Sequence, residues 1–211
     1  MENNKENAVA QLGTRLFGIY GQTKKGKDNT PIEWIELDND GTSVLMIAKF
    51  ILDSGIPYNT TKVDISWKNC SIRQWLNNEF FNKAFVADDK SKIKLCDISG
   101  NGISGADDDA EITQDKVFLL NTKEASQYFA KTVNRLAQGT EFAKNKGKTL
   151  FKSKGVLDIY KEHSWWWLRN RGSYGANLAA LVDNGGNVNP IGDNVHFLHG
   201  GVRPCIRVLL S

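Results

Sequence analysis

The feature that most constrains the fold of this chain is a change of composition near its C-terminus. Residues 170–201 contain no Lys, Glu, Gln, Met or Trp, although these five types occur 43 times in the other 179 residues. Independent sampling would leave such a window empty roughly once in several thousand cases. The window is flanked by WWWLR at 165–169 and by GVRP at 201–204. A bulky frame therefore brackets a charge-poor segment rich in Asn, Gly and Ser, a composition typical of adaptable recognition surfaces.

The five missing residue types share a property of the genetic code, because a codon that ends in a pyrimidine encodes none of them. An Asn codon randomised at its adenines yields Asn, Asp, His, Tyr, Ser, Gly and several small or apolar residues. These types fill the window. The alternative interpretation is an ordinary Gly/Asn-rich loop.

The pattern WWLR…G…A-A-x-V-x-x-x-G-x-V-x-x-x-G-x-x-V…GVRP resembles the variable region of target proteins of diversity-generating retroelements. In that family, adenines of a template repeat are mutagenised during reverse transcription and written into the target gene. The other shared motifs are Pro-Ile-Glu-Trp at 31–34, Ser-x-Arg-x-Trp-Leu-Asn at 71–77 and Val-Phe-Leu-Leu at 117–120, so the resemblance covers nearly the full length. It implies an α+β, C-type-lectin-like fold of the formylglycine-generating-enzyme subclass, a twisted antiparallel sheet with two helices and extensive loops.

Length and composition predict one domain. With 211 residues and 40% hydrophobic content, we expect a flexible arm at 1–13 and a single domain at 14–211 that carries the variable segment 170–201. The net charge of +3 indicates neither nucleic acid nor membrane as a partner. A polar start without a signal-peptide core and short apolar runs predict no signal peptide and no membrane insertion. We expect a protein made in the cytoplasm, with three reduced cysteines, and compatible with display on a virion.

Alternation of apolar and polar residues predicts a half-buried strand over 31–37, and nearly continuous apolar runs predict strands over 43–50 and 116–120. A further strand is expected over 15–20. The strands over 31–37 and 43–50 are expected to form a hairpin through the Asp-Asn-Asp-Gly turn at 38–41, since Asp-Gly supplies the positive φ that a tight turn needs.

Helical spacing predicts a helix over 71–81 with Ser71 as its N-cap. Its apolar residues are interpreted as core packing rather than a ligand pocket: Ile72, Trp75, Leu76 and Phe80. A short helix is expected over 88–95. Asn121 and Glu124 have the form of a capping box, and the helix that they open is expected to end near residue 135.

The frame around the window contains the candidate scaffold residues. Its tryptophans are expected to be buried anchors, its arginines to bind loop carbonyls, and its glycines to permit tight turns. These scaffold residues are Trp166, Trp167, Arg169, Gly186, Gly192 and Arg203. The residues expected to face inward between them are Ala179, Ala180, Val182, Val188 and Val195.

The other positions of the window are expected to face solvent, to differ between sister proteins, and to bind the ligand. Several are apolar, so we expect an exposed apolar patch of the kind that marks an interaction site. Tyr174 and Phe197 are the expected anchors, because aromatic residues dominate interface hot spots. The complete set is Ser173, Tyr174, Asn177, Leu178, Leu181, Asp183, Asn189, Pro190, Ile191, Asp193, Asn194, His196, Phe197, Leu198 and His199.

These features predict a ligand-binding, receptor-recognition module with a diversified C-terminal segment on a fixed scaffold. Its expected partner is a protein or glycan on a host or target-cell surface, with no nucleic acid as functional ligand. The alternative is an invariant carbohydrate-binding or structural domain of a phage tail or cell envelope. Variation confined to 170–201 among sister sequences would distinguish the two.

Catalysis and metal binding have little support in the sequence. His196, His199 and Asp193 have a spacing conceivable for a metal, yet a randomised Asn codon yields all three types freely. The chain has no nucleophile elbow, phosphate loop or HExxH motif, so we expect no enzyme, cofactor or metal. The acidic segment 97–109 is interpreted as a solvated loop, with structural calcium as the alternative. The Lys-rich segment 143–155 is interpreted as a solvated insertion rather than a phosphate-binding patch.

Overall fold

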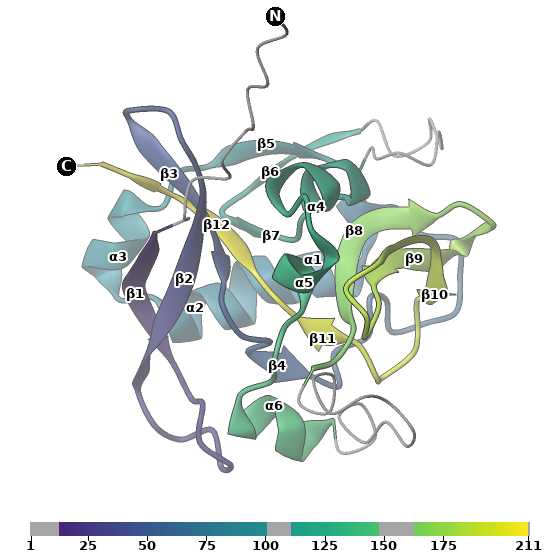
Figure 1. Cartoon of the computed structure of the whole chain (residues 1–211), viewed down its shortest axis with the longest axis horizontal. Helices are drawn as coiled ribbons and strands as arrows, with labels where there is room; N and C mark the ends of the chain where they lie inside the picture. The colour runs from purple at the N-terminus through teal and green to yellow at the C-terminus, as the bar shows by residue number, and fades with distance from the viewer. Residues whose placement is uncertain (1–12, 101–110, 148–162, 211) are drawn as a thin grey trace, which may run out of the picture.

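A computed structural model describes residues 13–100, 111–147 and 163–210 (Figure 1). Within these residues, strands form two five-stranded sheets and one two-stranded sheet, and every α-helix is short. One continuous buried cluster contains side chains from both larger sheets and from the helical segments between them in the sequence. No helix in this described part has the length and apolar character needed to cross a membrane.

The first sheet joins the two ends of the described chain. Its strands are β1 (Thr14–Tyr20), β2 (Thr30–Asn39), β3 (Ser43–Ala48), β7 (Val117–Phe118) and β12 (Cys205–Leu209). Their order is β1-β2-β3-β12-β7, so the last strand is inserted antiparallel between β3 and β7 (Figure 1). All of β3 is buried, as expected for an interior strand covered on both faces.

The second sheet carries the C-terminal window. Its strands are β4 (Asp53–Ser54), β8 (Trp166–Gly172), β9 (Gly175–Val182), β10 (Val188–Asn194) and β11 (Gly201–Val202). Their order is β10-β9-β8-β11-β4, and β11 runs parallel to β8 with Gly201 opposite Trp166. β11 and β12 are separated only by two residues, so the chain passes directly from this sheet into the first one. The third sheet pairs β5 (Cys96–Ser99) with β6 (Ile112–Asp115).

The expected two-helix, C-type-lectin-like fold is wrong. The described residues contain three sheets and six α-helices of four to seven residues. The helices are α1 (Ser71–Trp75), α2 (Phe81–Ala84), α3 (Ala87–Lys92), α4 (Thr122–Tyr128), α5 (Thr132–Arg135) and α6 (Glu141–Lys146). The motifs that carry the resemblance specify strands and their buried side chains locally, and such local patterns do not determine how the elements are arranged. The chain nevertheless combines helices and strands, as the broader α+β class does.

The predicted strands and hairpin are confirmed. The strands correspond to β1, β2, β3 and β7, of which β3 and β7 are shorter than expected. Gly41 has φ +82°, and the carboxylate of Asp40 accepts hydrogen bonds from the backbone and hydroxyl groups of Thr42 and Ser43. These bonds favour the ionised form and hold the pKa of Asp40 well below its usual range.

The helix predicted over 71–81 is present, but its cap is not Ser71. Cys70 is the N-cap and makes no side-chain capping bond, while the Ser71 hydroxyl donates to Asn59 Oδ1 at 2.9 Å. Between α1 and α2 the chain forms one π-helical stretch, η2 (Leu76–Phe80), where the side-chain amides of Asn77 and Asn78 donate to carbonyls one turn back. Side chains thus satisfy backbone acceptors in the region where the α-helical bonding pattern is interrupted.

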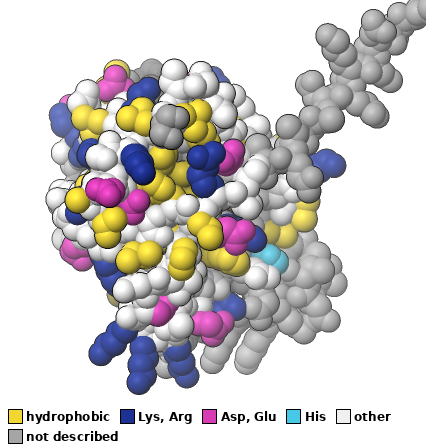
Figure 2. Space-filling model, turned by 90° about the vertical axis from the view of Figure 1, so that its left-hand side faces the viewer, with side chains coloured by type: hydrophobic (Ala, Val, Ile, Leu, Met, Phe, Trp, Pro, Cys, Tyr) yellow, Lys and Arg dark blue, Asp and Glu magenta, His cyan; other side chains and the backbone are white. Residues whose placement is uncertain are grey.

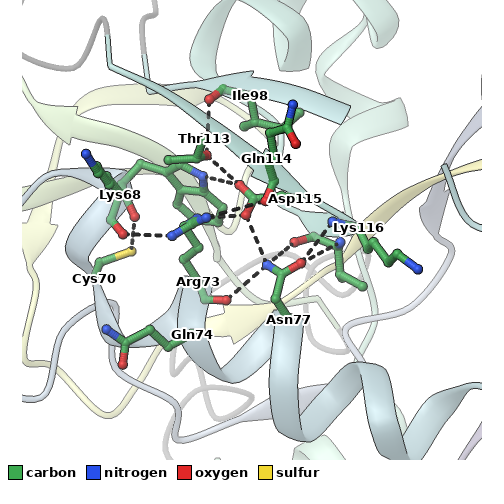
Figure 3. Close-up of polar contacts among 12 residues, drawn as sticks. Lys68, Cys70, Arg73, Gln74, Asn77, Ile98, Thr113, Gln114, Asp115 and Lys116 are labelled. Carbon is green, nitrogen blue, oxygen red and sulfur yellow. Dashed lines mark hydrogen bonds and ion pairs between the residues drawn. The ribbon is translucent and has the colours of Figure 1, made fainter. Parts of the chain in front are cut away.

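A buried carboxylate attaches this helix to the third sheet. Asp115 of β6 accepts hydrogen bonds from Trp67 Nε1 at 2.9 Å, Arg73 Nε at 2.7 Å and Thr113 Oγ1 at 2.7 Å (Figure 3). The amide of Asn77 bridges to the backbone of the next strand, since it donates to Val117 O at 2.8 Å. The Ser-x-Arg-x-Trp-Leu-Asn motif therefore positions two side chains, Arg73 and Asn77, that hold the helix in place.

The capping box is confirmed, although the helix that it opens is shorter than expected. Asn121 Oδ1 accepts from Glu124 N, and Glu124 Oε2 accepts from Asn121 N. α4 ends at Tyr128, and α5 is a separate helix of four residues. The 88–95 helix is present as α3, ending three residues earlier than expected. The predicted arm at 1–13 lies outside the described residues except for Gly13.

Candidate recognition surface

The scaffold begins with the tryptophans before the window. Trp166 and Trp167 are fully buried, as predicted, and Trp166 Nε1 donates to Arg135 O at 3.1 Å. Trp165 packs edge-on against Trp167 with ring centroids 4.7 Å apart, yet remains partly accessible. Two tryptophans therefore anchor β8 in the core, and the third lies at the edge of the surface.

Each predicted scaffold arginine binds backbone carbonyls. Arg169 donates from Nε to Ser99 O at 2.5 Å and from Nη1 to Leu119 O at 2.7 Å. Arg203 donates from Nε to Ala48 O at 2.8 Å. The predicted binding of backbone carbonyls by both arginines is therefore confirmed, and the carbonyls belong to segments that are distant in the chain. The arginines attach the frame to the rest of the protein.

The guanidinium of Arg203 is buried between two aromatic rings. It lies 5.1 Å from the ring centroid of Trp166 and 5.3 Å from that of Phe129. Burial lowers its pKa to about 10, so Arg203 remains protonated at neutral pH. The ring faces offer the cation an attraction that offsets part of the lost hydration.

The two scaffold glycines have backbone conformations and surroundings that exclude other residues. Gly186 has φ +81°, and a Cβ there would lie 2.2 Å from Thr132 O. Gly192 has φ +76°, and a Cβ there would lie 1.9 Å from Ala179 O. Gly186 O also accepts a 2.6 Å bond from Arg135 Nε. The glycines are therefore required both by φ and by close packing.

The inward-facing residues are placed as predicted, with one exception. Ala179, Ala180, Val182 and Val195 are fully buried, whereas Val188 is only partly buried against the core. The C-terminal half of β9 is therefore buried on both faces of the strand.

The predicted ligand-binding positions lie in β9, β10 and the connections around them. Tyr174 is 83% exposed, Leu198 58% and Ile191 47%, and Ser173 and His199 are exposed as well. The half-buried positions are Asn177, Leu178, Asp183, Asn189, Pro190, Asp193, Asn194, His196 and Phe197.

Leu181 is the exception, and its predicted exposure is wrong. It is only 6% exposed, because β9 lies between β10 and β8 and Leu181 is directly opposite Trp167 of β8. A central strand of a sheet buries the residues that share a face with its packed neighbours. Leu181 therefore belongs with the scaffold.

The exposed apolar side chains, together with the half-buried Phe197, belong to two groups along the chain. In the tip group, Tyr174 lies in the β8–β9 turn, and Ile191 lies in a bulge of β10 close to that turn. Ser173 N donates to Pro190 O at 2.9 Å, which holds the bulge against the turn. The loop group is Phe197 and Leu198, where the Phe197 ring packs between those of His196 and His199 at 5.2 and 6.4 Å.

A cavity of about 360 Å³ opens beside these groups. Trp165 forms part of its wall, and the remaining lining residues come from the window: Leu181, Asp183, Asn184, Gly185, Asn189, Gly192 and Asp193. The lining residues that the structure describes include two carboxylates and no Lys or Arg. Asn184 Oδ1 is buried without a hydrogen-bond partner among the described residues. The cavity therefore presents acceptors to a ligand.

The opposite side of the molecule has a different character. Around β1 and α3, hydrophobic side chains alternate with Lys, Arg, Asp and Glu (Figure 2). The window has no Lys or Glu at all. Charged groups thus interrupt the apolar areas on one side, while the candidate surface relies on aromatic, aliphatic and amide groups.

The described residues contain no group of three His, Cys, Asp or Glu side chains suited to a metal ion. His196 Nδ1 is instead a buried atom without a hydrogen-bond partner in this part of the chain. Most of the acidic segment considered for calcium falls on 101–110, outside the described residues. Residues 148–155 of the Lys-rich segment are outside them too, whereas Lys146 binds the buried Asp53 at 2.5 Å and is not freely solvated.

Two residues that position the surface were not predicted. Arg135 holds Gly186, and Asn170 connects three segments, since its Oδ1 accepts from Thr122 N at 2.7 Å and its Nδ2 donates to Gly100 O at 2.5 Å. Asn170 resembles the other asparagines of the window in sequence. No local signal distinguishes it, because its partners are far away in the chain.

No curated protein and no solved structure matches this chain. A family model described as a domain of unknown function (DUF6273) matches residues 41–209. The matched region contains the scaffold arginines, the helix at 71–84 and the whole window. The chain therefore belongs to the DUF6273 family.

Proposed function

We propose that this protein is a ligand-binding, receptor-recognition module whose segment 170–201 is diversified on a fixed scaffold. The observation that carries the proposal is the separation of roles within the window. Tyr174, Ile191 and Leu198 are exposed large apolar residues, while Trp166, Trp167 and Arg203 of the frame are buried. Exposed apolar groups on a charge-poor surface mark an interaction site.

Retroelement mutagenesis is the proposed source of the diversity. It rests on the residue types of the window, all of which pyrimidine-ending codons can encode, and on the frame that brackets it. The proposal does not depend on the rejected lectin-like fold. It requires only that the backbone be held by residues outside the variable set, as Gly186, Gly192 and Arg169 do.

The proposed ligand is a protein or glycan on a host or target-cell surface. The tip and loop groups favour contact with a protein, since aromatic and aliphatic anchors dominate protein interfaces. The cavity beside Trp165 suits a hydroxyl-bearing or cationic part of the ligand, because it offers the carboxylate of Asp193; both oxygens of Asp183 already accept hydrogen bonds from its own turn.

The decisive experiment reads the DNA of this locus and its flanks across a population. We expect a near-copy of the stretch that encodes 165–204, differing only where that copy holds adenine. Substituted codons should fall on exposed or half-buried positions and spare Leu181. A window that is identical between individuals, with no near-copy nearby, would favour the alternative of an invariant carbohydrate-binding or structural domain.

A second experiment tests whether the surface tolerates diversity. The triple variant Tyr174→Asp, Ile191→Asn, Leu198→His uses residues that a randomised Asn codon encodes. Its free energy of unfolding should stay within about 0.5 kcal/mol of wild type, as for typical surface changes. Leu181→Asn is the matched control and should lose about 2 kcal/mol or more, because it buries an amide in the core. Equal losses in the two variants would contradict the proposal.

A further inference from the structure

Two adjoining cavities lie along the helical run formed by α1, η2 and α2, outside the recognition surface. They measure about 240 and 620 Å³, and both are lined by Ile56, Trp75 and Glu79. Because they share these walls, they form a single groove along the helix. The apolar residues of the helix predicted over 71–81 were interpreted as core packing, but Trp75 is half-buried rather than buried.

One wall of the groove is the outer face of the helix. The residues that line it recur every three to four positions: Ser71, Gln74, Trp75, Asn78, Glu79 and Lys83. The π-helical stretch η2 lies within this wall. Such stretches are rare and occur frequently at functional sites, where they change the direction of side chains.

The smaller cavity ends on buried polar groups. Asp53 is buried, accepts a hydrogen bond from Tyr20 Oη at 2.7 Å and pairs with Lys146 Nζ at 2.5 Å. The Lys83 ammonium lies 4.5 Å from the ring centroid of Tyr20 and 5.6 Å from that of Phe142. Lys146 also lies over the Phe142 ring. Within the described residues, these two rings therefore already make cation–π contacts with lysines, so they are not free to bind a cationic ligand.

Among the described residues, the charges that line the groove balance. Asp53 and Glu79 carry two negative charges, and Lys83 and Lys146 carry two positive ones. The side chains of Gln74, Glu79 and Lys83 are exposed and make no hydrogen bond or ion pair with other described residues. They offer an amide, an acceptor and a donor beside the accessible Trp75 ring. A strongly charged ligand would meet like charge at some point along this groove.

We propose that this groove is a second binding site and that it takes a neutral oligosaccharide. The C–H face of a sugar ring stacks on the Trp75 indole, because both surfaces are flat and weakly polar. Its hydroxyls donate to Glu79, accept from Lys83 and exchange hydrogen bonds with Gln74. The length of the groove accommodates several sugar units, since the helix from residue 71 to 83 rises roughly 18 Å.

The groove lies next to the recognition surface but is built from different residues. Asn59 N donates to Val195 O at 2.7 Å, and a Cβ at Gly55 would lie 3.8 Å from Leu198 O and 4.0 Å from Lys146 Cε. The segment 55–60 therefore separates the loop group from the groove. Binding in the groove can be tested without changing any residue of the window.

The test titrates the intact protein with neutral hexasaccharides of glucose, mannose, xylose and N-acetylglucosamine. Calorimetry and tryptophan fluorescence report binding, and hexagalacturonate and a neutral Ser/Asn/Gly peptide serve as competing classes. At least one neutral hexasaccharide should bind with a dissociation constant below about 1 mM, and Glu79→Gln/Gln74→Ala should weaken it about tenfold. Asp88→Asn/Gln127→Ala makes the same chemical changes on α3 and α4 and should leave the affinity unchanged.

Four results would overturn the proposal, and the last of them comes from a variant of the recognition surface. The first is that no neutral hexasaccharide binds, the second that only the uronate or the peptide binds. The third is that the groove variant and its matched control bind equally well. Tyr174→Ala changes the recognition surface and should not alter this binding. If it does, the sugar site is in the window and the groove assignment is wrong, while the proposed recognition function is unaffected.

Discussion

Arg169 and Glu124 form a two-point ion pair, with Nη1 2.5 Å from Oε2 and Nη2 2.6 Å from Oε1. Oε2 also accepts from the backbone N–H of Asn121, so the same carboxylate caps α4. One side chain therefore fixes both the start of a helix and an arginine of the frame. Arg169 is buried, so the water lost by its guanidinium group is replaced by this carboxylate and by the surrounding carbonyls.

The pair should stabilise the fold measurably. Glu124→Gln should lower the free energy of unfolding by about 3 kcal/mol, because it leaves the buried guanidinium without a counter-charge. Glu141→Gln is the control, since Glu141 pairs with Lys144 on the surface, and it should cost under about 0.5 kcal/mol. Urea denaturation gives both values. A double-mutant cycle with Arg169→Met should show coupling, and strict additivity would contradict a direct interaction.

Alanine substitutions at Gly41 and Gly192 separate two contributions to the loss of stability, the strain of a positive φ and the steric clash of a Cβ. Both glycines have φ near +80°, but a Cβ at Gly41 meets nothing within 4 Å, whereas one at Gly192 meets Ala179 O. Gly41→Ala should cost about 1 kcal/mol for the left-handed backbone alone. Gly192→Ala should cost clearly more, or prevent folding. Thermal melts of the two variants check this, and equal shifts would mean that the β10 bulge relaxes freely.

Removal of the Asp115 carboxylate should be strongly destabilising. Asp115→Ala leaves the donors of Trp67 and Arg73 without this acceptor in a buried site, while Thr113 keeps its bond to Ile98 O, so we expect a loss of about 3 to 5 kcal/mol. Asp88→Ala removes an exposed carboxylate in α3 and should be nearly neutral. If denaturation shows similar values for both, the network in Figure 3 contributes little to stability.

Stability should fall at alkaline pH. Burial raises the pKa of the Cys205 thiol above its ordinary 9.0, and burial together with Asp53 raises the pKa of Tyr20 above 10.0. When the pKa of a group is raised in the folded state, the unfolded chain loses the proton first as the pH rises. The free energy of unfolding is therefore unaffected below the ordinary pKa of the group and declines above it. Each group should contribute a slope of about 1.4 kcal/mol per pH unit.

The variant Cys205→Ala isolates one of these contributions. Its free energy of unfolding, measured by urea denaturation in steps between about pH 8 and pH 10, should fall less steeply than that of wild type. The readout is the slope, so the constant loss from a smaller side chain does not interfere. Identical slopes would show that the Cys205 thiol does not titrate differently in the folded and unfolded states.

Short-range features were predicted well from the sequence. The Asp-Gly turn, the Asn121–Glu124 capping box and the glycines with positive φ follow from interactions within a few residues. Ser71 was misplaced as a cap because its hydroxyl has a partner twelve residues away, Asn59. The two-helix fold was wrong because local motifs carry no information on strand order.

The features of the candidate surface also divide into those that the sequence predicts locally and those that depend on distant contacts. The residue types of the window, together with the spacing of its glycines and small apolar residues, predicted which segment is exposed to solvent and which residues form its frame. Only the tertiary structure decided that Leu181 is buried opposite Trp167, that the arginines bind Ser99, Leu119 and Ala48, and that Trp75 lines a groove. The reason is physical: φ preference and amphipathic spacing act along the chain, whereas burial and ion pairing depend on side chains brought together from distant positions.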